Sequence, residues 1–500
     1  MFRNYKLLKR FPLSIKGISK KCSSKKSALL IPGRIGSNFT PTVMPYINVE
    51  EHFTQKIDKI KQSLVLRGTA ISEINLEKFV AAGTNLRKID SEVEHLDSRR
   101  EEIKKDFTKI DDQLVLTKLQ EEAKVIKSSL KQLRRHRWKL EETVLIEYLR
   151  LPNILHDSTP TDSEDQILEE FGNKPELDNE DVRGHMELIR DHIDFSSKNP
   201  SSGYYLLDVM AELEVTLTWA IQDFLLQAGL NMFSGPDFTR SAIVEGCDPN
   251  TDFFSDDSGK ENVFSLAPTS DFGDVSSLAG THLVGSASLE SFIGQFVKNI
   301  IVNPQSSLPI TYFSCGRKYK PIKNVHLNTK DSLYTTQQST AIELCCVASS
   351  ASSLQEQLKY IQTFTKEFYS LIGLHCRIVK RHAGNINHAA QNMKLSILVY
   401  SPHVKDYIEV GHFGIYGDFL SRRLMLLSED GNRYKDLHIL SGTFMNVTKM
   451  MGCIIESSQI YCDKMQKSKM KEILTKMLKS VSDIQLHYTS NINSSNGVHL

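Results

Sequence analysis

The stretch HILSGTFMNVTK, residues 438–449, is the part of this chain that says most about its fold. It stands near the end of a region in which short β-rich runs alternate with longer helical patterns, and helices are expected over 354–371 and 443–456. This order predicts an α+β domain with a mixed, largely antiparallel sheet flanked by helices. The expected strands cover 282–284, 308–313, 340–347, 395–399 and 407–410.

Two hydrophobic seams lie on the N-terminal side of this domain. Apolar residues recur at alternating steps of three and four between Phe79 and Ile110, and again between Leu116 and Val144. Such heptad spacing is typical of long helices that pack along one stripe. A short polar turn near Asp111 separates the seams, so the sequence predicts a long antiparallel coiled-coil arm with helices of about 30 residues, or about 45 Å.

Basic side chains gather on the second helix of the predicted arm. In one interpretation they form a solvated charged face, which is the usual role of such runs. In the other they form a phosphate-binding patch for RNA near the base of the arm. The sequence leaves both open, and the RNA-binding candidates are Lys131, Arg134, Arg135, Arg137 and Lys139.

The N-terminal segment is basic and free of acids. No acidic residue precedes Glu50, and the first 49 residues contain ten Lys and Arg among several hydroxyl side chains. This composition is typical of a mitochondrial transit peptide and predicts a location in the mitochondrial matrix. The alternative is a basic arm that binds RNA, and the two roles are compatible if cleavage falls early.

Composition limits the remaining classes of protein. The chain has 500 residues and a formal net charge of +1, so it is long enough for two or three domains but carries no global charge for nucleic acid. No apolar run of 18 residues predicts a membrane span. The eight cysteines form no C-x-x-C pair, so no metal site is expected. The expected divisions are a targeting or basic segment at 1–45, a helical arm at 46–150, an acidic linker and entry segment at 151–200, a globular domain at 201–478 and a polar tail at 479–500.

The opening stretch resembles the third signature of class II aminoacyl-tRNA synthetases, in the form that seryl-tRNA synthetases use. His438, Gly442 and Thr443 keep the frame of that signature. Ser441 stands at its asparagine position. Lys449 stands where the family has an arginine that holds the ATP γ-phosphate. Lysine keeps the charge but loses the planar fork that grips two phosphate oxygens.

Weaker matches extend the resemblance over about 53–471. RLPNILHDSTP, residues 150–160, resembles the joint between arm and body, and HMELIRDHIDF, residues 185–195, resembles the entry into the catalytic domain. NMFSGPDF, residues 231–238, resembles motif 1, with Pro236 at its proline position. That motif builds the dimer interface in the family. The resemblance therefore implies a class II synthetase fold, preceded by the arm, and a dimer.

The resemblance also implies roles for three polar residues of the body. In FSCGRKYKP, Arg317 falls at the motif 2 arginine that contacts the ATP α-phosphate. Glu343 aligns with a glutamate that contacts serine, and Glu409 aligns with the Mg-ATP carboxylate. Glu343 has a plainer interpretation as a satisfied buried acid, and Arg317 could instead bind a carboxylate or an RNA phosphate. Arg422 and Arg423 could be ion-paired residues of the scaffold.

Other positions depart from the family pattern. Ser288 replaces the carboxylate that binds the substrate amino group, and Tyr319 replaces the glutamate at the adenine. His412 replaces a site serine. A cationic amino group without a counter-charge in a partly dry pocket is costly. The vestigial nucleotide and serine site therefore comprises Arg317, Glu343, Glu409, Thr443 and Lys449, with substitutions at Ser288, Tyr319, His412 and Ser441.

These departures predict a catalytically degenerate seryl-tRNA synthetase-like protein that requires no cofactor, with binding of ATP and Mg left open. The resemblance is strongest to a non-aminoacylating mitochondrial branch known from insects, which implies protein partner binding. The expected partner is mitochondrial seryl-tRNA synthetase in a heterodimer, or a second copy in a homodimer, with mitochondrial RNA or tRNA as a further candidate. The alternatives are an active mitochondrial serine–tRNA ligase with a substituted site and a mitochondrial RNA-binding module.

Overall fold

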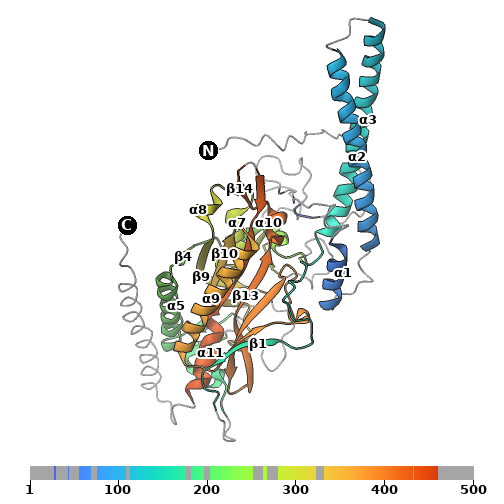
Figure 1. Cartoon of the computed structure of the whole chain (residues 1–500). Coiled ribbons are helices and arrows are strands. Elements are labelled where there is room, and N and C mark those ends of the chain that lie inside the picture. The colour runs from blue at the N-terminus through green and yellow to red at the C-terminus, as the bar shows by residue number, and fades with distance from the viewer. Residues whose placement is uncertain are drawn as a thin grey trace.

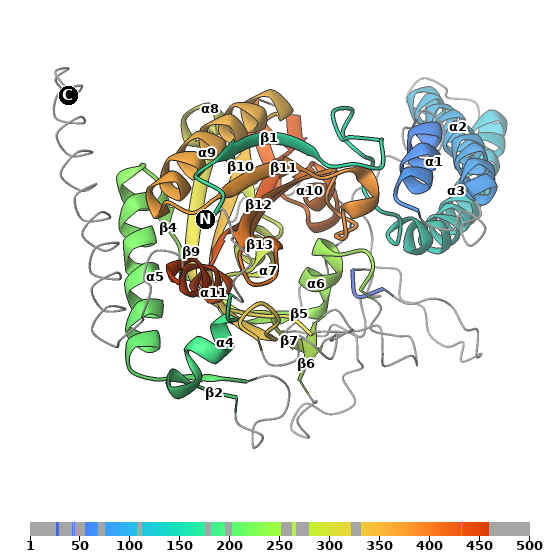
Figure 2. The ribbon, with the colours of Figure 1, turned by 90° about the horizontal axis from the view of Figure 1, so that it is seen from below.

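A helical arm stands on a globular body in the computed structural model (Figure 1). The structure describes residues 27–29, 43, 45, 56–68, 76–107, 113–175, 182–195, 203–251, 263–266, 280–321, 332–431 and 433–459. Seen from below, the two arm helices lie to one side of the body (Figure 2). Among the described residues, no helix is long and apolar enough to cross a membrane.

The arm is a hairpin of α2 (Leu76–Phe107) and α3 (Gln113–Tyr148), with the shorter α1 (Ile57–Leu66) packed at its base. The predicted coiled-coil arm is therefore confirmed, although the turn at 108–112 lies outside the described residues. The seam between the two helices forms two small hydrophobic cores. The charged faces on either side of the seam stay in solvent. The buried residues are Phe79, Ala82 and Val144 near the base, and Ile103, Leu119, Ile126 and Leu130 further out.

An eight-stranded sheet forms the centre of the body. Its strand order is β1-β11-β12-β13-β16-β10-β9-β4, and every neighbouring pair is antiparallel except β4 with β9. The antiparallel sheet flanked by helices is thus as predicted. The strands are β1 (Gln166–Phe171), β4 (Asn231–Met232), β9 (Ile310–Tyr319), β10 (Gln338–Ala348), β11 (Cys376–Lys380), β12 (Met393–Ser401), β13 (Asp406–Gly417) and β16 (His438–Asn446).

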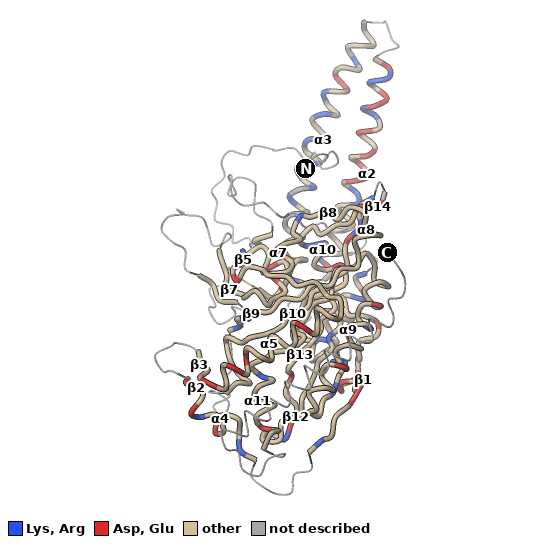
Figure 3. Tube along the Cα trace, turned by 90° about the vertical axis from the view of Figure 1, so that its left-hand side faces the viewer, with Lys and Arg blue, Asp and Glu red and all other residues tan. Residues whose placement is uncertain are grey.

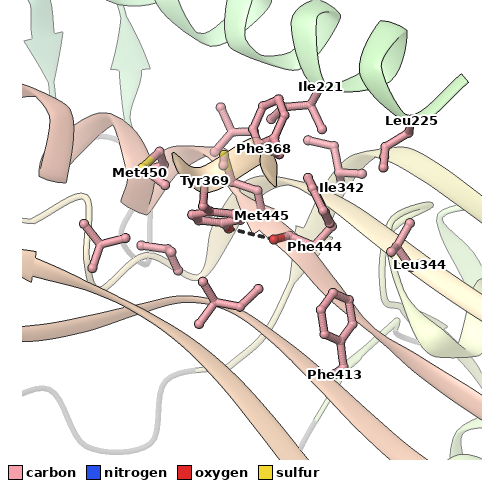
Figure 4. Close-up of a cluster of buried hydrophobic side chains, with 14 of the residues drawn as sticks. Ile221, Leu225, Ile342, Leu344, Phe368, Tyr369, Phe413, Phe444, Met445 and Met450 are labelled. Carbon is pink, nitrogen blue, oxygen red and sulfur yellow. Dashed lines mark hydrogen bonds between the residues drawn. The ribbon is translucent and has the colours of Figure 1, made fainter. Parts of the chain in front are cut away.

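One face of the sheet is covered by α5 (Val209–Gln227), α9 (Ala351–Ile372) and α11 (Val447–Ser458). Apolar side chains of these helices pack on alternate residues of β10 and β16, as a strand with one face toward the helices requires. Figure 4 shows this core, in which the Tyr369 hydroxyl donates to the Phe444 carbonyl oxygen at 2.7 Å. The labelled members are Ile221, Leu225, Ile342, Leu344, Phe368, Tyr369, Phe413, Phe444, Met445 and Met450.

The opposite face packs against α6 (Ser241–Cys247), α7 (Leu289–Phe296) and α10 (Phe419–Leu424). The remaining short elements surround these layers. They are α4 (His185–Leu188), α8 (Pro304–Ser307), two 3-10 turns (Arg190–His192, Ala383–Asn385), β2 (Ile193–Asp194), β3 (Tyr205–Leu206), β5 (Phe238–Arg240), β6 (Phe264–Ser265), β7 (Thr281–Leu283), β8 (Ile300–Ile301), β14 (Leu427–Asp430) and β15 (Arg433–Asp436).

The helix predicted over 443–456 begins too early. β16 runs to Asn446, because its pairing with β10 continues to that residue, where Asn446 lies opposite Ala341. The helix α11 starts only at Val447, where the Asn446 side chain accepts a hydrogen bond from the Lys449 N–H at 3.0 Å and caps it. Most of the stretch at 438–449 is therefore a central strand.

Two predicted boundaries are also wrong. The acidic linker at 151–200 contains β1, which pairs with β11 as an edge strand of the main sheet. The targeting segment at 1–45 contains Ser27, Leu29 and Val43, which are buried against the body. Pairing partners and core positions more than 200 residues away decide both outcomes, and composition does not reveal them. The polar tail at 479–500 lies outside the described residues.

Candidate functional site

The central strands bring a group of charged side chains to one face of the sheet. Glu343 of β10 lies opposite Thr443 of β16, and β9 delivers Lys318 to the same face. The Thr443 hydroxyl donates to Glu343 Oε2 at 2.7 Å, and Lys318 Nζ lies 2.9 Å from both Glu343 Oε2 and Thr443 Oγ1. Burial raises the pKa of Glu343, and Lys318 opposes that shift. The carboxylate is therefore paired with a cation from its own chain.

Glu409 of β13 is the centre of a second cluster. Lys394 Nζ lies 2.9 and 3.0 Å from its two carboxylate oxygens, the Ser396 hydroxyl donates at 2.7 Å, and Arg381 donates at 3.1 Å. Burial would raise the pKa of Glu409, but the charge of Lys394 and the hydrogen bonds from Lys394 and Ser396 outweigh it and hold the pKa well below its ordinary value. The group is therefore an anion with three donor side chains around it.

His412 and Lys449 lie beside Glu409. His412 Nδ1 is 3.6 Å from Glu409 Oε1, and Lys449 Nζ donates to the Glu409 backbone carbonyl at 3.3 Å. Burial, together with Lys394, holds the pKa of His412 well below its ordinary value, so the imidazole is neutral at pH 7. Burial also lowers the pKa of Lys449. Glu343, Thr443 and Glu409 thus lie on the adjoining strands β10, β16 and β13, and Lys449 lies in the first turn of α11 beside Glu409.

Arg317 does not join this group. Adjacent residues of a strand point to opposite faces, and here Arg317 donates to Glu214 of α5 at 3.0 Å and to Thr340 at 2.7 Å. Lys318 takes the place beside Glu343 that we expected for the arginine. The prediction that Arg317 belongs to the site is therefore wrong, because the motif fixed its position in the sequence but not the face on which it lies.

The substituted positions have structural roles. Ser288 caps α7, accepting a hydrogen bond from the Ser291 N–H at 3.3 Å and donating to the Gly285 carbonyl at 2.7 Å. Ser441 is fully buried and donates to the Leu344 carbonyl at 2.7 Å. The Tyr319 N–H donates to the Val284 carbonyl at 3.1 Å. The hydroxyl groups of Ser288 and Ser441 are therefore occupied by hydrogen bonds to backbone carbonyls of the body.

The Pro236 loop packs on α7, and α5 separately carries an exposed apolar stripe. The Pro236 carbonyl accepts a hydrogen bond from the Ser291 hydroxyl at 3.1 Å, which ties this loop to α7. On α5, Val215, Trp219 and Leu226 are 68%, 59% and 50% exposed. Their spacing of four and seven residues places them along one side of the helix. Exposed apolar side chains in such a row are typical of a protein-binding surface.

Basic and acidic residues both occur along the arm (Figure 3). Arg134 pairs with Asp97 at 2.7 Å, and Arg137 pairs with Asp90 at 2.5 Å, so α2 neutralises two of the five RNA-binding candidates. Lys131, Arg135 and Lys139 are exposed. The structure thus pairs Arg134 and Arg137 with acids of α2, and leaves Arg134 exposed together with Lys131, Arg135 and Lys139.

Lys394, Arg381 and Lys318 were missed by the sequence reasoning. Lys318 could have been found from strand alternation. It lies four residues after Ser314 on β9, so both side chains point to the same face, and Ser314 pairs with Glu343. Lys394 and Arg381 carry no local signal, because β11 and β12 reach Glu409 only through the sheet order. Among the described residues, no group of three or more His, Cys, Asp or Glu side chains could hold a metal ion.

Comparison with known proteins places this arrangement in a family. A model of the seryl-tRNA synthetase N-terminal domain matches residues 51–155, and a model of the tRNA synthetase class II core domain (G, H, P, S and T) matches residues 283–458. Together they cover more than half of the chain. The chain belongs to the class II seryl-tRNA synthetase family.

Relatives of this seryl-tRNA synthetase family member include both a synthetase-like protein and ligases. The serine–tRNA synthetase-like protein Slimp of Drosophila melanogaster is 26% identical over 89% of this chain and 93% of that protein. The serine–tRNA ligase of Rubrobacter xylanophilus is 24% identical over 82% of this chain and 93% of that enzyme. The seryl-tRNA synthetase of Pyrococcus horikoshii, solved with ATP, shares the fold with a TM-score of 0.67 at 18% identity, covering 81% of this chain and 93% of that one.

Proposed function

We propose that this chain is a catalytically inactive member of the seryl-tRNA synthetase family. The observation that carries the proposal is that the two retained site carboxylates are bound by cations of the chain itself. Lys318 pairs with Glu343, while Lys394 and Arg381 pair with Glu409. A substrate ammonium group at Glu343 would have to displace the half-buried Lys318 from a buried carboxylate, which is costly in a partly dry site.

The arrangement at Glu409 does not fit a magnesium ligand. Magnesium binds through carboxylate oxygens and keeps several waters in near-octahedral geometry. Both oxygens of Glu409 already accept hydrogen bonds from Lys394, and one accepts from Ser396 and Arg381 as well. Lys394 and Arg381, which lie close to the carboxylate, would also repel a magnesium ion. The loss of the arginine fork at Lys449 weakens phosphate binding further.

Serine-dependent ATP–pyrophosphate exchange tests this proposal. The full chain and an active serine–tRNA ligase are measured side by side with serine, ATP and magnesium. We expect exchange from the ligase and none above background from this chain. Exchange that depends on serine would overturn the proposal and would favour the alternative, an active mitochondrial ligase with a substituted site.

We also propose that α5 binds a protein partner in the mitochondrial matrix. The supporting observation is the exposed stripe of Val215, Trp219 and Leu226. The proposed partner is mitochondrial seryl-tRNA synthetase, with a second copy of this chain as the other candidate, in support of mitochondrial translation or homeostasis. The acid-free N-terminal segment supports the matrix location.

A charge placed in the stripe tests the partner proposal. Trp219→Asp should abolish the complex that the wild-type chain forms with the tagged synthetase or with itself, measured by mass in solution after co-expression. Val125→Asp on the arm is the matched control, because Val125 is 64% exposed and lies far from α5. A wild-type chain that stays monomeric with and without the synthetase would contradict the proposal.

RNA binding by the arm is a second candidate function. Lys131, Arg135 and Lys139 favour it, because these three basic side chains are exposed on one helix. Exposed lysine and arginine bind phosphates without sequence preference and release counterions. Such binding is compatible with the partner proposal, since the arm and α5 belong to different parts of the molecule (Figure 1).

A further inference from the structure

Three residues near the start of the chain are fixed to α6. The Ser27 hydroxyl donates to Glu245 Oε1 at 2.5 Å, and the Ala28 N–H donates to Oε2 at 2.5 Å. The Leu29 N–H donates to Ser27 Oγ at 3.2 Å, which closes a compact turn. Both oxygens of one carboxylate are therefore bound by a segment more than 200 residues away in the sequence.

Apolar burial adds to these hydrogen bonds. Leu29 is fully buried, and Val43 is 4% exposed. Both belong to the core that also contains Leu149 at the base of the arm and Phe292 of α7. Truncation of a fully buried leucine side chain leaves a cavity that the surrounding structure fills only in part. The segment is thus part of the core and does not merely lie on the surface.

Glu245 makes the segment necessary to the body. The residue is 8% exposed, and burial raises the pKa of its carboxyl while the Ser27 and Ala28 donors oppose that shift. Arg423 donates to the Glu245 backbone carbonyl. Among the described residues, the hydrogen-bond donors to its carboxylate are Ser27 and Ala28. Without the segment, a buried acid would lose both hydrogen bonds, which is destabilising.

We propose that Ser27, Ala28, Leu29 and Val43 form a permanent anchor of the mature protein, and that any processing of the N-terminus removes only residues before Ser27. The anchor itself is independent of the proposed function, whereas the processing rests on the proposed mitochondrial location. The segment available for targeting is then 1–26. It still holds nine of the ten basic residues that precede Glu50.

The N-terminus of the mature protein tests the processing. The full chain with a C-terminal tag is expressed in cells, purified from the mitochondrial fraction, and its first residues are sequenced. We expect a start at or before Ser27. A start beyond Leu29 would overturn the anchor. An uncleaved chain found outside mitochondria would retain the anchor and contradict the proposed location, so the two failures are distinguishable.

Substitutions in the full chain test the anchor itself. Leu29→Ala and Ser27→Ala should each lower the thermal unfolding midpoint, and Leu29→Ala should lower it more. Because Ser27 acts through Glu245, Ser27→Ala should have little further effect in a Glu245→Met background, which has no oxygen to accept the hydroxyl. Val125→Ala, at a side chain of the arm that is 64% exposed, is the control and should leave the midpoint unchanged. Unchanged midpoints for both anchor variants would overturn the proposal, and Ser27→Ala keeps the test usable if Leu29→Ala does not fold.

Discussion

Single residues decide what the candidate site can bind. Glu343, Glu409 and Thr443 stand on neighbouring strands, as their resemblance to family positions implied. The cations beside them are different from those expected: Lys318 pairs with Glu343, and Arg317 pairs with Glu214 on the helix-covered face. Motif matching predicted which acids survive. It did not predict their partners, because a shift of one position on a strand moves a side chain to the other face.

Lys394 stabilises the folded state through Glu409. Lys394→Met should lower the free energy of unfolding by about 1–3 kcal/mol, because a half-buried carboxylate loses its main donor and keeps Ser396 and Arg381. Urea unfolding at pH 7 measures the loss. Lys435→Met is the control, since Lys435 pairs with Asp430 at an exposed site where such pairs contribute about 0–1 kcal/mol. Equal losses in the two variants would show that Lys394 stabilises the fold no more than an exposed ion pair does, and would contradict this prediction.

The pH dependence of stability should reflect the same carboxylate. The pKa of Glu409 is depressed in the folded state from an ordinary value of 4.5. The unfolded chain therefore binds the proton more tightly, so the contribution is fully present above about pH 4.5 and is lost as the pH falls below it. Glu409→Gln should reduce the slope of the free energy of unfolding against pH on the acid side, measured by urea unfolding at pH values from about 3 to 7. A slope as steep as that of the wild type would contradict this assignment.

At the scale of elements, periodicity predicted the arm well and the end of the sheet less well. The heptad spacing from Phe79 to Val144 gave both arm helices, because a seam between two helices is a local pattern. The stretch at 438–449 was partly assigned to a helix, and its residues up to Asn446 form β16 instead. The sequence of a strand that is buried on both faces is a continuous apolar run. Hydrophobic periodicity does not distinguish such a run from a buried helix.

The arm should bind RNA through its outward-facing basic residues, if the second candidate function holds. Replacing Lys131, Arg135 and Lys139 with Gln should reduce the slope of log affinity against log salt by about 0.7 for each phosphate that the arm no longer neutralises. The double variant Arg134→Gln and Arg137→Gln is the matched control, because these side chains already pair with Asp97 and Asp90. Titration of labelled tRNA at several salt concentrations measures both slopes. Equal slopes in the triple variant and the wild type would rule out the patch.

At the scale of the whole molecule, the connections between distant segments could not be predicted. β1 completes the edge of the sheet from a segment expected to be a linker, and residues 27–29 close the core beside α6. Neither connection has a local sequence signal. Arg423 shows the same principle, because it joins three parts of the chain: its guanidinium donates to the carbonyls of Leu149 at the arm base and of Glu245 and Gly246 in α6.

Arg423→Lys should therefore weaken the joint between arm and body. Lysine keeps the charge but cannot reach three carbonyls in the geometry of the guanidinium fork, so at least one buried acceptor loses its donor. We expect a loss of about 1–3 kcal/mol in the free energy of unfolding, together with faster trypsin cleavage near Arg150. Arg433→Lys, at an exposed position on β15, is the control and should change neither measurement. A stable Arg423→Lys protein with unchanged cleavage would mean that the arm is held by its apolar packing alone.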